Sequence, residues 1–266
     1  MRETSAADAG GFIRYYVIDG AGPVHVHLAP LICPATATML QVATHPRLAG
    51  RASILIDYFG CGLSDRPAGF SHTMQAHADT ISAVLDHEGV RESVVIGHSM
   101  GGTVGLLVAL SRPDLVGRLV LGESNLEPGG GDGTRRIAAV PVDEYVAETS
   151  VRELDMLRRA ASRGATWAAT YLAIREHGSD PRAVHAASVD IVGLDSSLLR
   201  RFLDLAIPRT FVYGGRTLAD LDGRWTPDVP DPAVLEAHGV RTIVIPDAGH
   251  FMYVDDLDGY AAAVAQ

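Results

Sequence analysis

The chain has little of three things that mark particular classes of protein. Its 266 residues include two cysteines, Cys33 and Cys61, which form no metal-binding spacing and no disulfide framework. Positive charge is scarce, and the net charge of −10 argues against nucleic acid and anionic membrane surfaces as partners. No run of 18 apolar residues occurs, so no segment is expected to span a membrane.

The N-terminus also lacks a recognisable targeting segment. The first eleven residues are small and polar, without the apolar stretch of a signal peptide. Together with the low cysteine content, this favours a cytoplasmic location. Apolar residues, in contrast, make up 47% of the chain, enough for the core of one large domain or of a domain with an insertion.

Residues 94–102 carry the strongest local pattern. A β-branched apolar run ends at Gly97, Ser99 follows, and Gly101 comes just before an apolar helical stretch. This pattern fits the G-x-S-x-G nucleophile elbow, a strand, a tight turn and a helix. It would place the Ser99 hydroxyl at the carboxyl end of the strand, with the Met100 N–H aimed at an oxyanion. The alternative is a structural glycine-rich turn with a surface serine.

Strands alternate with helices on both sides of this elbow, which predicts a mostly parallel α/β sheet flanked by helices. Between them, residues 142–205 show only helical patterns, which predicts an all-helical cap. We therefore expect a core of residues 1–126 and 206–266 and a cap of residues 127–205. The expected strands are 12–18, 24–28, 53–57, the elbow strand, 118–122, 209–213 and 241–245, and the expected core helices are 73–87, the elbow helix and 257–265.

A serine nucleophile needs a base and a group that orients the base. His250 follows Gly249 in the loop after the last strand, so it is the favoured base. His98 is expected to be a packed neighbour, because adjacent strand residues point to opposite faces. Glu123 directly follows a strand and is favoured as the acid by its spacing, while Asp220 is the alternative acid. Glu123 also fits a helix cap or a salt bridge.

The second donor of an oxyanion hole, beside Met100, is expected after the 24–28 strand. Pro30 has no N–H, so Leu31 is favoured and Ala29 comes next. Large side chains are candidates for an apolar substrate pocket, although each would fit a protein core equally well. The candidates are Trp167, Tyr171, Phe251 and Met252.

Three segments together resemble the α/β-hydrolase fold superfamily: 97–102, the loop 57–65, and 248–250. The resemblance covers about residues 12–265 and implies a cap after the family's sixth strand. It also implies a triad of Ser99, Glu123 and His250. A glutamate at this place is similar to haloalkane dehalogenases, whose nucleophile is aspartate, and to zearalenone-type lactonases, which combine Ser, Glu and His. The chain departs from the family's His-Gly motif at residues 29–30, which are Ala-Pro.

The sequence thus predicts a serine hydrolase, without cofactor or metal, that cleaves a small apolar carboxylic ester, a lactone included. Nucleic acid and membrane are not expected as partners, and homodimer formation is left open. A thioesterase and a C–C bond hydrolase would use the same triad. A non-catalytic ligand receptor on a hydrolase scaffold is a third alternative, because fold does not fix reaction.

Overall fold

The computed structural model describes residues 1–6 and 10–266. Its centre is an eight-stranded sheet in the order β1-β2-β4-β3-β5-β6-β7-β8. β1 and β2 are antiparallel to their neighbours, and all other neighbouring strands are parallel. This confirms the predicted mostly parallel sheet. The strands are β1 (Arg2–Ala6), β2 (Gly11–Ile18), β3 (Ala21–Leu28), β4 (Arg51–Ile56), β5 (Ser93–His98), β6 (Val116–Gly122), β7 (Arg209–Gly214) and β8 (Arg241–Ile245).

The N-terminal strand β1 was not expected from the sequence. It pairs with β2 at the edge of the sheet, from Arg2 opposite Tyr15 to Ala6 opposite Gly11. Its side chains are mostly exposed and polar, so it lacks the apolar alternation that signals a strand. Residues 7–9, part of the polar N-terminal stretch discussed above, lie outside the described residues.

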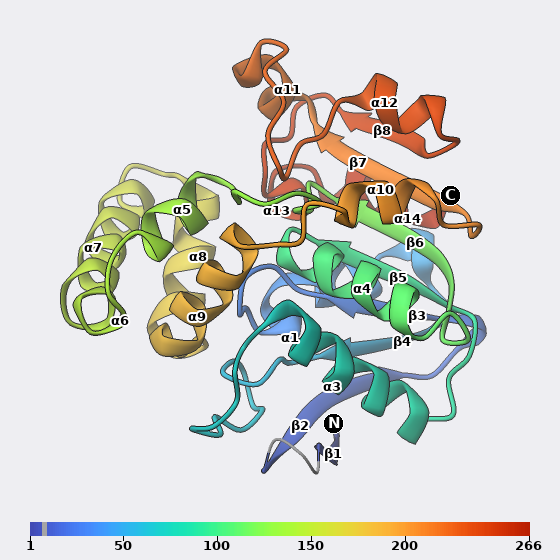
Figure 1. Ribbon diagram of the computed structural model, residues 1–266, viewed down its shortest axis with the longest axis horizontal. Coiled ribbons are helices and arrows are strands. Elements are labelled where there is room, and N and C mark those ends of the chain that lie inside the picture. Colours follow the sequence, from blue (N-terminus) through green and yellow to red (C-terminus); the bar gives the residue numbers. More distant parts are fainter. Residues whose placement is uncertain (7–9) are drawn as a thin grey trace.

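Helices lie on both sides of the sheet, and Figure 1 shows α3 and α4 in front of it with α14 fainter behind. Between β3 and β4 the chain forms three short helical turns, the last of which begins at Pro46. No helix in the described ranges is long and apolar enough to cross a membrane. The core helices are α1 (Ala35–Thr38), α2 (Leu40–Ala43), η2 (Pro46–Leu48), α3 (Met74–His87), α4 (Met100–Ser111), α11 (Gly215–Leu221), α12 (Pro232–Ala237), α13 (Met252–Asp255) and α14 (Leu257–Ala265).

A block of helices is inserted between β6 and β7, as predicted. Figure 1 shows α5 to α9 gathered at one side of the sheet. Helix α5 was not expected from the sequence; it follows the glycine-rich stretch 129–131 and begins at Asp132. The block contains α5 (Asp132–Ala138), α6 (Val142–Glu144), the π-helical turn η3 (Tyr145–Thr149), α7 (Ser150–Ala161), α8 (Thr166–His177), α9 (Pro181–Val192) and α10 (Leu198–Leu203).

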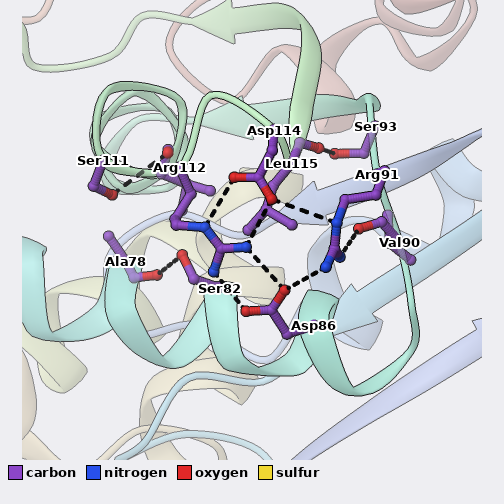
Figure 2. Close-up of polar contacts among 11 residues, drawn as sticks. Ala78, Ser82, Asp86, Val90, Arg91, Ser93, Ser111, Arg112, Asp114 and Leu115 are labelled. Carbon is purple, nitrogen blue, oxygen red and sulfur yellow. Dashed lines mark hydrogen bonds and ion pairs between the residues drawn. The ribbon is translucent and has the colours of Figure 1, made fainter.

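A surface ion network connects the carboxyl ends of α3 and α4 (Figure 2). The Arg112 guanidinium binds both oxygens of Asp86, at 2.5 and 2.9 Å, and also contacts Asp114 at 2.8 Å. Arg91 adds contacts of 3.1 Å to Asp86 and 3.4 Å to Asp114. The hydrogen bonds from Arg112 hold the pKa of both carboxyl groups below the ordinary value. A bidentate network of this kind fixes helix ends better than an isolated surface pair does.

Candidate active site

The elbow has the strained backbone that its sequence predicts. Ser99 lies between β5 and α4 with φ 54° and ψ −122°, a conformation that non-glycine residues rarely adopt. The turn is tight, because a Cβ atom at Gly97 would come within 2.5 Å of the Gly101 backbone. A Cβ at Gly101 would lie 2.2 Å from the carbonyl oxygen of Leu28 on β3. The two glycines therefore let strand and helix approach closely enough to present Ser99.

Replacing Gly101 by alanine is expected to destabilise the protein by about 2 kcal/mol or more, because backbone atoms must move to admit the methyl group. Chemical denaturation of the variant measures this change. Gly69→Ala is the matched control, since a Cβ at Gly69 meets no atom within 4 Å. Equal stability of the two variants would contradict the tight-turn explanation.

The structure brings Glu123 and His250 together from two different strand ends. The His250 Nδ1 atom lies 2.8 Å from Glu123 Oε2. The other carboxylate oxygen, Oε1, accepts a hydrogen bond of 2.8 Å from the Gly214 N–H. Glu123 is fully buried, so both bonds hold the carboxylate in one orientation. Because a carboxylate only accepts, Nδ1 carries the ring proton and Nε2 of the neutral ring is left as an acceptor.

The alternative acid is not part of this arrangement. Asp220 is exposed on α11, and none of the hydrogen bonds found among residues 1–6 and 10–266 joins its side chain to His250. In physical terms, β7 is followed at once by a helix, which carries Asp220 onto the surface.

Opposing effects set the pKa of His250. Burial lowers it, whereas the hydrogen bond and negative charge of Glu123 raise it, and the charge of Asp228 adds to the increase. The net result is a pKa above the ordinary value of 6.5. The Glu123 carboxylate thus makes the imidazole a stronger base, as a general base requires.

His98 is a packed and hydrogen-bonded neighbour of the elbow. Its ring is fully buried, and Nε2 donates to the His250 carbonyl oxygen at 2.7 Å. Burial holds its pKa well below the ordinary value, so the ring stays neutral. His98 therefore ties the backbone of the His250 loop to the end of β5.

One cavity of about 470 Å³ contains Ser99, Glu123 and His250. Its other lining includes three of the predicted pocket residues. Trp167 and Phe251 stack with ring centroids 5.7 Å apart, and Tyr171 lies 5.0 Å from Phe251. Met252 does not line the cavity, since its side chain is fully buried and packs next to Gly122.

Of the two residues expected to form the oxyanion hole, Met100 directly follows Ser99 and Leu31 lines the same cavity. Leu31 follows β3 and lines the cavity, and its N–H has no acceptor in the part of the chain that the structure describes. Met100 is the first residue of α4, where a backbone N–H has no partner within the helix. The neighbouring Ile32 has a positive φ of 45°, so this loop too is conformationally strained.

Sequence reasoning missed two polar residues of the cavity. Asn125 is buried and its Oδ1 atom has no partner among the described residues. Its position in the sequence, two residues after Glu123, could have been used to predict that it lies in the cavity. Arg175, on α8, also lines the cavity, but nothing in the sequence distinguishes it from the other arginines of the helical block. The described ranges contain no cluster of three acidic, His or Cys side chains suited to a metal ion.

Comparison with known proteins now identifies the family. A family model described as alpha/beta hydrolase fold matches residues 38–181, more than half of the chain. This chain belongs to the alpha/beta hydrolase fold family. Haloalkane dehalogenase 2 of Mycobacterium bovis is 25% identical to this hydrolase over 273 residues, which cover 95% of this chain and 90% of the relative.

Solved structures agree with the hydrolase fold over nearly the whole chain. A thermophilic esterase from Thermogutta terrifontis matches with a TM-score of 0.76 at 20% identity, covering 99% of this chain and 97% of the esterase. An enol-lactonase from Burkholderia xenovorans LB400 matches with a TM-score of 0.76 at 18% identity, covering 99% and 98%. The likeness confirms the fold predicted for this hydrolase.

Proposed function

We propose that this hydrolase cleaves a carboxylic ester, a lactone included, with Ser99 as nucleophile, His250 as base and Glu123 as the acid that orients the base. The observation that carries the proposal is the 2.8 Å hydrogen bond from His250 Nδ1 to a buried Glu123 carboxylate in the cavity that Ser99 lines. The structural likeness to the esterase and to the enol-lactonase described above supports it.

In the first half-reaction, Ser99 Oγ attacks the carbonyl carbon while His250 Nε2 takes the hydroxyl proton. The carbonyl electron pair moves to oxygen, where the N–H groups of Leu31 and Met100 stabilise the negative charge. When the tetrahedral intermediate collapses, the alkoxide leaves and takes the proton from His250. Glu123 remains a carboxylate and stabilises the imidazolium.

In the second half-reaction, His250 takes a proton from water, whose oxygen attacks the acyl carbon. The intermediate then releases the carboxylic acid, and Ser99 Oγ recovers the proton. We further propose that residues 127–205 act as a cap over a core of residues 1–126 and 206–266. The cap supplies Trp167 and Tyr171 to the cavity and so selects the substrate.

The test is a substrate panel of 4-nitrophenyl acyl esters, unactivated lactones and acyl thioesters, with Ser99→Ala protein as the blank. Turnover of esters or lactones above the blank is the expected result. Turnover of thioesters alone would favour a thioesterase. Absence of turnover throughout the panel would contradict the proposal and leave the C–C hydrolase and the receptor as the remaining hypotheses.

Glu123→Gln is expected to lower kcat/KM on the order of 10²- to 10⁴-fold and to shift the acid limb of the pH profile to lower pH. His250 must be neutral to accept a proton, so in the unchanged enzyme activity falls as the pH drops through a value above 6.5. Without the carboxylate, burial dominates and the pKa of His250 falls. The measurement is kcat/KM against pH for both proteins.

Asp220→Asn is the matched control for this measurement and should leave rate and profile unchanged. An acid limb that stays in place in the Glu123→Gln enzyme, or one that moves in the Asp220→Asn enzyme, would contradict the assignment of the acid.

A further inference from the structure

Arg175 holds a guanidinium group inside the candidate active site. Its Nη2 atom donates to the Tyr171 hydroxyl at 3.0 Å, and its Cζ atom lies 4.9 Å from the centre of the Tyr171 ring. The residue lines the same cavity as Ser99 and His250. The side chain is therefore held in place from one side by an aromatic neighbour.

The other side of this guanidinium has no partner. Nη1 is buried and makes no hydrogen bond within the described parts of the chain, and no carboxylate there lies within 4.0 Å of Arg175. Glu153 lines the cavity too, but it accepts a 3.0 Å hydrogen bond from the Tyr145 hydroxyl. Nearby phenol, thiol and carboxyl groups outweigh burial and raise the pKa of Arg175, so the group keeps its charge.

A structural arginine in the same protein is bound differently. Arg209 directs its two terminal nitrogens at the backbone carbonyls of Phe202, Leu203 and His238, at 2.6 to 3.1 Å. Only its Nε lacks a partner among the described residues, and the three carbonyl acceptors account for its position in the fold. Arg175 has only the Tyr171 hydroxyl as a hydrogen-bond partner. Glu153 acts on it from a distance, but no carboxylate among the described residues is close enough to form an ion pair, and an unpaired buried cation is costly. Such a group is expected where a ligand supplies the missing negative charge.

We propose, building on the ester hydrolysis proposed above, that the substrate carries a carboxylate and that Arg175 binds it through Nη1. A charge-assisted hydrogen bond from Nη1 to a carboxylate oxygen is stronger than a neutral one, and the aromatic surroundings strengthen it by excluding water. The cavity of about 470 Å³ holds both the cation and the nucleophile, so carboxylate and scissile carbonyl belong to one small molecule. Half-esters of short dicarboxylic acids and carboxylated lactones are the matching class.

Other charges on the cavity wall do not offer an equivalent site. Arg135 binds Asp132 on its own helix, and Arg136 is exposed at the surface. Glu153 and Asp228 are acidic and would repel an anion. Arg175 is thus the cavity cation that combines a buried position with an unused donor.

The experiment compares 4-nitrophenyl hydrogen adipate with 4-nitrophenyl hexanoate, which has the same chain length without the carboxylate. We expect the unchanged enzyme to favour the adipate ester in kcat/KM. Arg175→Met should lower that preference roughly ten- to a hundredfold, mainly through KM for the adipate ester, and Arg175→Lys should restore part of it. Arg159→Met, on exposed α7 surface, is the matched control and should leave the preference unchanged.

Binding of adipate itself to Ser99→Ala protein, measured by calorimetry, separates this inference from the proposed reaction. Adipate should bind this protein and should not bind the double variant with Arg175→Met. Binding that is unaffected by the second substitution, or equal turnover of both esters, would overturn the carboxylate site. Binding without turnover of any ester would leave the site standing and overturn the ester hydrolysis. Thermal unfolding of Arg175→Met provides a further check, because a lower melting temperature would indicate a structural arginine instead.

Discussion

Replacing Ser99 by alanine is expected to lower kcat/KM for a 4-nitrophenyl ester on the order of 10⁵-fold. In the proposed reaction the hydroxyl oxygen forms the acyl-enzyme bond, and alanine offers no substitute for it. A residual rate above that of water alone should persist, because the backbone N–H groups proposed to stabilise the oxyanion do not depend on the side chain. Initial rates measured at high enzyme concentration are needed to detect this residual activity.

Ser111→Ala is a suitable control for this experiment. Its hydroxyl donates to the Leu107 carbonyl at the far end of α4, so the same helix is changed without touching the cavity. A fluorophosphonate should add its mass to the peptide that contains Ser99 in the unchanged protein and in Ser111→Ala. Full activity in Ser99→Ala, or labelling of a different peptide, would refute the assignment of Ser99 as the nucleophile.

A second large effect, on stability, is expected when the pH is lowered. We expect the free energy of unfolding to fall by several kcal/mol between pH 7 and pH 4, because buried histidines stay neutral in the folded state. Burial is the main cause in each case, and it lowers the pKa of His25 to about 4 and that of His27 to about 3. In the described chain, the pKa is also lowered for three further histidines, His72, His77 and His98.

The sign follows from proton binding. Below pH 6.5 the unfolded chain takes up protons that the folded protein cannot, so acid favours unfolding. A histidine whose pKa falls from 6.5 to about 4 costs about 3 kcal/mol once the pH is below both values. The loss should therefore begin near pH 6.5, above the range in which ordinary carboxylates titrate.

Urea denaturation at pH 7.5, 6.0, 5.0 and 4.5 measures this loss. His77→Phe should flatten the pH dependence, because the ring already packs against Tyr58 and Phe70 and both its nitrogens lack partners among the described residues. His87→Gln, exposed at the end of α3, is the control and should keep the dependence of the unchanged protein. Stability that is constant from pH 7.5 to pH 5.0 would refute the explanation.

The sequence was informative about this site where the backbone decides the position of a side chain. Ser99, Glu123 and His250 each follow a strand of a parallel sheet, and parallel strands end at the same edge. Their presence in one cavity therefore follows from the order of elements. The choice of Glu123 over Asp220 as the acid was argued from spacing, and the geometry of the His250 hydrogen bond supports it.

The sequence was uninformative where packing between helices decides. Arg175 reaches the cavity because of how α8 lies over the sheet edge, and no periodicity encodes that arrangement. Met252 was predicted to line the pocket from its type and its place after Phe251, but α13 begins there and turns it inward. The edge strand β1 and the helix α5 were missed because polar, glycine-rich stretches give no apolar pattern.

The contacts of Glu123 have a consequence for how the protein can vary. Its N–H donates to the Val212 carbonyl at 3.1 Å and its carboxylate accepts from Gly214, both on β7, the strand to which the chain returns after the helical block. Hydrogen bonds thus connect Glu123, where the helical insertion leaves the sheet, to β7, where the chain returns to it. Helical segments of different length or shape could be inserted between these two points, and Glu123 would keep its hydrogen bond to His250.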